Sequence, residues 1–314
     1  MIFGIPYFYC IEKSGFVYSV DSLRATFFLD EENTQYLFSN YQHIFDWFTN
    51  VQLKSEPEVS YRKLEFEVEY STPNYKKLIA HICISMYSGT IANGFIHFNP
   101  NRLFQSQQAY EEITRFFSYC SYLEVCKCDV AIDFPYCICD LVPLKGRKQM
   151  RIHFESQKSY TVYWGERNKI GHAKLYSKSD KNKLSENIVR LELTLGNPAL
   201  PEWKKVLNNI IPPIYLSPFA VSTLNTKLTS PERVIILLAA HLLNDFKNRA
   251  FLFRALELYE DKARRKIIKD MILSGNKPLQ VDYDAITEVV KTVVHKIMDN
   301  QADDNSDNMS SVCQ

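Results

Sequence analysis

The chain has 314 residues, 46% of them hydrophobic, and a formal net charge of +1, so it can bury one large core or two modest ones. Its longest apolar run, VIILLAAHLL at residues 234–243, is too short to span a bilayer, and residues 1–10 lack the basic start and apolar region of a secretion signal. Eight cysteines without such a signal indicate reduced thiols, so we expect a cytoplasmic protein with no membrane partner.

Short runs rich in aromatic and β-branched residues dominate the first 200 residues and predict a multi-stranded antiparallel sheet. The first of these runs cover residues 20–29, 62–70, 79–87 and 93–100. Apolar residues spaced by three and four predict two inserted helices, over residues 31–50 and 108–124. Helices packed on one side of such a sheet make an α+β fold.

Polar side chains recur at every second position of three later strands, at residues 125–134, 172–178 and 189–195. The side chains expected on their polar faces are Lys127, Asp129 and Asp133; His172, Lys174, Tyr176 and Lys178; and Arg190, Glu192 and Thr194. If the three strands lie in one antiparallel sheet, carboxylates, cations and a phenol share its open face. Such a face is costly to leave without a ligand, and its chemistry suggests phosphodiester cleavage.

Positive charge is concentrated around Tyr176. Residues 1–140 carry 10 Lys and Arg against 17 Asp and Glu, whereas residues 141–192 carry 12 against 5. An enzyme that acts on a polyanion is expected to place its cations beside the reacting group. The alternative is a solvated lysine-rich loop.

The last third of the chain is predicted to be helical. Five prolines between residues 198 and 218 discourage regular structure, and helices are expected over residues 231–249, 250–273 and 284–299. The basic cluster at residues 262–269 fits either a DNA backbone contact or a solvated helix face. The predicted divisions are a domain at 1–200, a proline-rich linker at 201–229, a helical C-terminal domain at 230–298 and a disordered tail at 299–314.

Several of these segments resemble the filamentous-phage gene II replication endonucleases. TVYWG at 161–165, AKLYSK at 173–178 and VRLELTL at 189–195 resemble the core of those proteins, and related motifs occur in the replication-initiation-factor family of rolling-circle plasmids and mobile elements. KCDVAID at 127–133 resembles their Arg-Ile-Asp strand, and FIHFNPNRLFQ at 95–105 resembles a block with Asn-Pro that precedes it. The matches follow the same order over about a third of the chain.

The resemblance implies a rolling-circle replication initiator whose catalytic domain occupies residues 1–200. Such an enzyme nicks one strand at the replication origin, becomes attached to the 5′ phosphate through a tyrosine, and later rejoins the strand. Origin DNA is the implied partner, with a host helicase and single-strand-binding protein as possible others. Two alternatives are a relaxase of a mobile element and a DNA-binding regulator that kept the fold without the chemistry.

Tyr176 is the predicted nucleophile. A free phenol has a pKa of about 10, so a tyrosine needs a nearby cation or metal to stabilise its phenolate. The strand prediction gives this task to Lys174 and Lys178. Tyr160 and Tyr163 are the alternative nucleophiles.

Carboxylates on the same predicted faces are candidate ligands for Mg²⁺ or Mn²⁺, because these ions prefer hard oxygen donors. The predicted metal ligands are Asp129, Glu192 and Asp133, and the predicted contacts to DNA phosphates are Lys127, Arg190 and Arg167. Lys127 stands where the resembled family usually has arginine, and no His-hydrophobic-His metal motif is present. Glu192 could instead pair with Arg190, and His97, His153 and Glu155 are further candidates.

Four cysteines offer a different metal site. Cys126, Cys128, Cys137 and Cys139 form a C-x-C-x8-C-x-C pattern that could close a tetrahedral zinc site. The spacing differs from the common two-residue knuckle, and Cys126 and Cys128 fall on the apolar face of their predicted strand.

Overall fold

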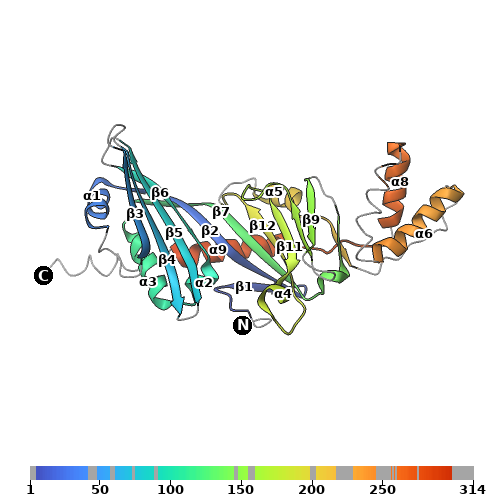
Figure 1. Cartoon of the computed structure of the whole chain (residues 1–314), viewed down its shortest axis with the longest axis horizontal. Helices are drawn as coiled ribbons and strands as arrows, with labels where there is room; N and C mark the ends of the chain where they lie inside the picture. The colour runs from blue at the N-terminus through green and yellow to red at the C-terminus, as the bar shows by residue number, and fades with distance from the viewer. Residues whose placement is uncertain are drawn as a thin grey trace. The chain divides into compact units, whose positions relative to one another are not determined.

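The computed structural model describes residues 5–41, 48–56, 61–72, 75–87, 91–144, 148–154, 160–198, 203–216, 229–244, 256, 258, 260–273 and 276–298. The chain divides into two compact units that interleave in sequence (Figure 1). The first unit contains Met1–Ile132, Glu192–Leu207 and Tyr283–Gln314, and the second contains Asp133–Leu191 and Asn208–Asp282. No helix within the described ranges is both long and apolar enough to cross a membrane.

Antiparallel strands form the first unit. They are β1 (Cys10–Lys13), β2 (Phe16–Leu29), β3 (Phe48–Glu56), β4 (Tyr61–Thr72), β5 (Tyr75–Tyr87) and β6 (Ala92–Phe98). The order is β3-β4-β5-β6-β2, with β1 also paired to β2. In the sheet β2 is followed by β7 (Tyr122–Phe134) and β12 (Val189–Leu195), each of which is divided between the units.

One face of the first unit's sheet is apolar because hydrophobic residues occupy every second position. Its inward side chains include Leu23, Ala25 and Phe27 of β2, Ile96 and Phe98 of β6, and Ile82 and Ile84 of β5. The helix α3 (Gln107–Ser118), capped by Ser106, sets Phe116 against Phe27 and Phe117 against Phe98. The helix α9 (Tyr283–Met298) buries an apolar stripe and packs on β1 and β2. Figure 1 shows α3 and α9 behind these strands.

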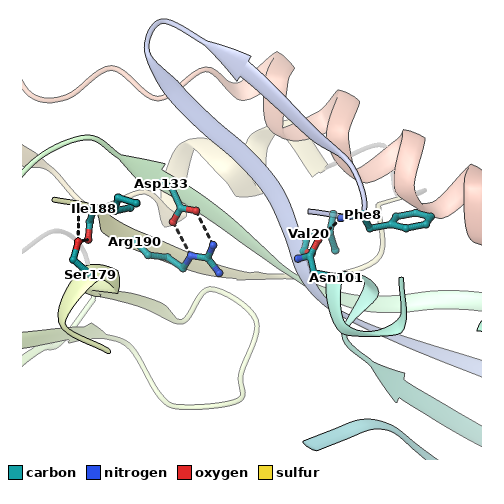
Figure 2. A network of polar contacts seen from close by, with 7 residues as sticks. All are labelled: Phe8, Val20, Asn101, Asp133, Ser179, Ile188 and Arg190. Atoms are coloured by element: carbon teal, nitrogen blue, oxygen red, sulfur yellow. Dashed lines mark hydrogen bonds and ion pairs between the residues drawn. The ribbon is translucent and has the colours of Figure 1, made fainter. Parts of the chain in front are cut away.

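The segment from Phe95 to Gln105 joins this sheet to its helices. Asn99 caps α2 (Pro100–Leu103) by accepting a hydrogen bond from the Arg102 amide, and Pro100 occupies the first helical turn. Buried Asn101 accepts from the Phe8 amide at 2.7 Å and donates to the Val20 carbonyl at 2.9 Å (Figure 2). This side chain therefore ties the N-terminal segment and β2 to α2.

The second unit carries β9 (Met150–Phe154), β10 (Tyr160–Trp164) and β11 (Ala173–Ser177), paired antiparallel in the order β9-β10-β11. A separate pair joins β8 (Leu141–Pro143) to β13 (Ile214–Leu216). The helices of this unit include α4 (Lys178–Asn182), α6 (Ser230–Asn244) and α8 (Lys262–Leu273), and α5 (Trp203–Ile210) crosses the division. The helices α6 and α8 enclose a small apolar core with Val142 and Leu144.

The α+β class, with a large antiparallel sheet and helices on one side, is confirmed. Three element boundaries were wrong. The helix predicted over 31–50 is α1 (Glu31–Asn40), and residues 48–56 form β3. The helix predicted over 108–124 ends at Ser118, since β7 begins at Tyr122. Residues 201–229, predicted as a linker, contain α5 and β13.

The compact units also differ from the predicted divisions at residues 200 and 230, because α9 belongs to the first unit and not to a separate helical domain. The predicted disordered tail, residues 299–314, lies outside the described residues.

Candidate functional site

Tyr176 lies on β11, and its side chain is only 4% exposed. Lys174, two residues earlier on the same face of the strand, places Nζ 4.1 Å from the centre of the Tyr176 ring. Lys181 of α4 places a second Nζ 5.0 Å from the ring centre. Two ammonium groups therefore face the ring of the predicted nucleophile, where they would favour negative charge on its oxygen.

Neighbouring strands add polar groups to this face. Thr161 of β10 lies opposite Tyr176, and Tyr163 lies opposite Lys174. Thr161 and Tyr163 are in turn opposite His153 and Arg151 of β9. Side chains at directly opposed positions share a face, so Arg151 and His153 belong to the Tyr176 face of the second unit. Glu155, the third candidate of that series, lies outside the described residues.

Lys178 was predicted to lie on the same strand as Tyr176, but it follows the end of that strand. The strand ends at Ser177, whose hydroxyl accepts a hydrogen bond from the Asp180 amide and caps α4. Lys178 is the first residue of that helix, and its own amide donates to the Ile188 carbonyl at 2.8 Å. The second cation at the ring is instead Lys181, which period-two spacing along a strand cannot reveal because it sits on a helix.

Short-range bonds hold α4 in place. The Ser179 hydroxyl donates to the Glu186 carbonyl at 2.6 Å. It also accepts from the Ile188 amide at 2.5 Å (Figure 2). The helix closes at Lys183, which adopts a left-handed conformation with φ of 54°. The turn that carries Lys181 is therefore held by hydrogen bonds of Ser179 to Glu186 and Ile188 and by the cap at Ser177.

The two alternative tyrosines occupy different surroundings. The Tyr160 hydroxyl is buried within hydrogen-bond distance of the Ile138 and Leu141 carbonyls, at 2.9 Å and 2.8 Å. Trp164 on the same strand face donates to the Leu144 carbonyl at 3.0 Å. These bonds give Tyr160 and Trp164 a structural role against residues 138–144. Tyr163, half-buried and stacked on His172, remains on the Tyr176 face.

Asp133 and Arg190 contact each other in the interior of the second unit. The guanidinium donates from Nε to Oδ1 and from Nη2 to Oδ2, both at 2.6 Å, and both side chains are almost fully buried (Figure 2). The fork uses both carboxylate oxygens. A metal role for Asp133 or a phosphate role for Arg190 would require this pair to open, so we assign the pair to the fold.

Asp129 and Glu192, the other predicted metal ligands, belong to the first unit, on β7 and β12, and both are half-buried. Asp129 Oδ2 accepts from the Ser22 hydroxyl at 2.7 Å. Its Oδ1 is buried and receives no hydrogen bond from the part of the chain that the structure describes. Burial lowers the pKa of His97, while the Asp129 charge acts in the opposite direction, so His97 lies within electrostatic reach of this carboxylate.

Among the described residues, no three His, Cys, Asp or Glu side chains form a group that could hold a metal ion. This finding contradicts the zinc alternative, since all four cysteines of that pattern are described. Burial raises the pKa of Cys126 and Cys128, which opposes the thiolate form that zinc binds. Magnesium sites differ, because Mg²⁺ keeps several waters and uses only one or two carboxylates.

Lys127 lies half-buried on β7 of the first unit, within electrostatic reach of His97. Arg167 is exposed in the turn between β10 and β11 of the second unit, where Glu166 pairs with Lys169. That pair lowers the pKa of Glu166, and Arg151 acts in the same direction. Arg167 is thus carried by the hairpin that leads into the Tyr176 strand.

No family model and no curated protein sequence matches this chain. Among solved structures, the rolling circle replication initiator protein from Geobacillus stearothermophilus is similar over 68% of this chain and 90% of its own, with 14% identity and a TM-score of 0.36. A TM-score of this size does not establish a shared fold.

Proposed function

We propose that this protein initiates rolling-circle DNA replication by nicking and rejoining one strand of an origin, with Tyr176 as the nucleophile. The observation that carries the proposal is the pair of ammonium groups, from Lys174 and Lys181, at 4.1 Å and 5.0 Å from the Tyr176 ring. The motifs TVYWG, AKLYSK and VRLELTL, which resemble replication endonucleases, support the same reading.

In the proposed reaction the Tyr176 oxygen attacks the scissile phosphorus and loses its proton. The bond from phosphorus to the 3′ oxygen breaks, and that oxygen leaves as a 3′ hydroxyl after gaining a proton. The 5′ phosphate stays attached to the tyrosine until a 3′ hydroxyl attacks it and releases the phenol. Lys174 and Lys181 stabilise the phenolate, and Arg151, Lys174 and Lys181 attract the phosphate.

We propose that the reaction uses Mg²⁺ or Mn²⁺, ions that polarise phosphates in reactions of this kind. Asp129 and Glu192 are the residues we propose to hold the ion. The support comes from Asp129, whose buried Oδ1 has no hydrogen-bond donor among the described residues while Oδ2 is held by Ser22. A carboxylate oxygen left in this state fits a hard cation. Asp133 is not included, since Arg190 occupies both its oxygens.

The test is covalent capture. The protein is incubated with supercoiled DNA that carries its own gene, and nicked product and a protein-DNA adduct that survives denaturation are sought. Rolling-circle initiation predicts both products. Cleavage without an adduct, at any metal concentration, would contradict a phosphotyrosine intermediate.

Asp129→Asn and Glu192→Gln are each expected to reduce Mg²⁺-dependent or Mn²⁺-dependent nicking by at least about 100-fold without unfolding the protein, because each removes a charged ligand and keeps the shape of the side chain. Mn²⁺ binding is measured in parallel by electron paramagnetic resonance, and melting temperature reports folding. Exposed Glu186→Gln serves as the control. Full Mn²⁺ binding by both variants would remove Asp129 and Glu192 from the site.

Lys174→Ala and Lys181→Ala are each expected to weaken the salt dependence of binding. The magnitude of the slope of log affinity against log salt should fall by about one, since each variant removes one phosphate contact. Origin affinity is measured by fluorescence anisotropy at several salt concentrations. Exposed Lys291→Ala on α9 is the matched control and should leave the slope unchanged. The same slope for Lys181→Ala and Lys291→Ala would show that Lys181 contacts no phosphate and belongs to a solvated helix face.

A further inference from the structure

The second face of the first unit's sheet lies opposite the apolar face that α3 covers. The strand register identifies its side chains, which alternate along each strand with the buried ones. Those on β2, β6 and β5 are Ser22, Arg24, Thr26 and Phe28; Asn93, Phe95 and His97; and His81, Cys83 and Ser85. Arg24, Phe28 and Asn93 are exposed, so this face is open to solvent.

Two large aromatic side chains lie on this face where a polar residue would be expected. Phe28 at the end of β2 is 46% exposed, and Tyr122 at the start of β7 is 50% exposed. Their ring centres are 6.0 Å apart. The Ser121 amide and hydroxyl both bond to the Phe28 carbonyl, which fixes the start of β7 beside Phe28. The pair is therefore held in place although it is not part of the core.

A second group of planar side chains lies further along β2. The Arg24 guanidinium stacks over the Phe95 ring at 3.9 Å, and the His81 ring lies 5.7 Å from Phe95. His81, His97 and Arg24 occupy directly opposed positions on β5, β6 and β2. Arg24 and Phe28 are four residues apart on one strand, which separates the two groups by about 13 Å.

The carboxylates around these groups are mostly engaged by neighbours. Glu124 accepts from the Tyr122 hydroxyl at 2.9 Å and from Asn197 at 2.5 Å. Asp129 accepts from Ser22 through Oδ2 only, and Glu65 pairs with Lys63. Glu67 lies opposite His81 on β4, away from Phe28. Arg24 and Lys127 add positive charge near His97, so β2 and β7 each carry an aromatic residue at one end and a cation further along the strand.

We propose that this face binds single-stranded DNA by stacking bases on two platforms, the Phe28–Tyr122 pair and the Arg24–Phe95 stack with His81. The proposal rests on the proposed function only in taking DNA as the substrate. Exposed aromatic rings and guanidinium planes on an open sheet face suit unpaired bases, because every base has a π face and a duplex hides it. Arg24 and Lys127 are placed to meet the phosphates between the bases.

The test measures binding of fluorescently labelled oligothymidylate by the Tyr176→Phe protein, in which strand cleavage does not interfere. Phe28→Ala, Tyr122→Ala and Arg24→Ala are each expected to weaken binding by about 5-fold to 100-fold. Phe104→Ala is the matched control, because Phe104 is 53% exposed and lies at the end of α2. Binding of a duplex of equal length should change by less than about 2-fold in all four variants, since its bases are already stacked.

Melting temperatures establish that each variant is folded, and the three variants act independently, so one unfolded variant leaves two to decide. Unchanged oligothymidylate affinity in the folded variants would overturn the platforms. Equal losses of affinity for the single strand and the duplex would also contradict the proposal. A loss of oligothymidylate affinity in Phe104→Ala as large as in the platform variants would contradict it too. Origin nicking is assayed separately on the parent protein. Platform-dependent binding without nicking would retain this inference and reject the proposed function, and nicking without such binding would do the reverse.

Discussion

Tyr176→Phe is expected to abolish the covalent protein-DNA adduct and to lower nicking by about 10³-fold or more, while origin binding stays within a few-fold. The substitution removes only the attacking oxygen and keeps the ring that the Lys174 and Lys181 ammonium groups face. Adduct formation is measured on denaturing gels with labelled DNA, nicking on supercoiled DNA, and affinity by fluorescence anisotropy.

Tyr163→Phe and Tyr160→Phe are the controls for this prediction. Tyr163 shares the face of Tyr176, so its variant should retain the adduct if Tyr176 is the nucleophile. Tyr160→Phe should lower stability instead of chemistry, because its hydroxyl bonds to buried carbonyls of residues 138–141. An adduct that persists in Tyr176→Phe and disappears in Tyr163→Phe would move the nucleophile to Tyr163.

Breaking the Asp133–Arg190 pair is expected to cost about 3–5 kcal/mol in the free energy of unfolding. Asp133→Ala leaves the buried Arg190 charge without its partner carboxylate. Arg190→Met leaves the buried Asp133 charge without its partner guanidinium. Unfolding in urea, followed by circular dichroism, measures the loss.

The double variant Asp133→Leu with Arg190→Met separates the pair from its surroundings. It removes both charges, so much of the lost stability should return. Arg115→Met is the matched surface control, since Arg115 pairs with Glu112 on the exposed side of α3, and its cost should stay below about 1 kcal/mol. A loss of that small size in Asp133→Ala would contradict a structural role for the buried pair and reopen Arg190 as a phosphate contact.

The sequence was sufficient wherever neighbouring residues decide the structure. Alternation along residues 125–134 predicted the burial of Cys128, Val130 and Ile132 on β7, because successive side chains of a strand point to opposite faces, but it did not predict the burial of Asp133. The same rule placed Lys174 beside Tyr176, and the apolar spacing of residues 284–299 predicted α9. These relations depend on backbone geometry over a few residues.

The ends of helices and strands were harder to predict from the sequence. The predicted helix over residues 31–50 extended into residues 48–50, yet these belong to β3, which pairs with β4. Lys178 likewise falls just past the cap at Ser177. Partner strands and capping bonds decide such boundaries, since intrinsic propensity differs by little between the alternatives.

Only the tertiary structure decided which distant groups meet. It brought Lys181 to the Tyr176 ring, joined Arg190 to Asp133 across 57 positions of sequence, and aligned His81, His97 and Arg24 on three strands. It also placed α9 in the first unit with β2, although the helix begins at Tyr283, 254 residues after β2 ends at Leu29. The physical reason is that residue spacing sets the direction of a side chain, whereas strand order, register and packing set its neighbours, and these depend on the whole chain.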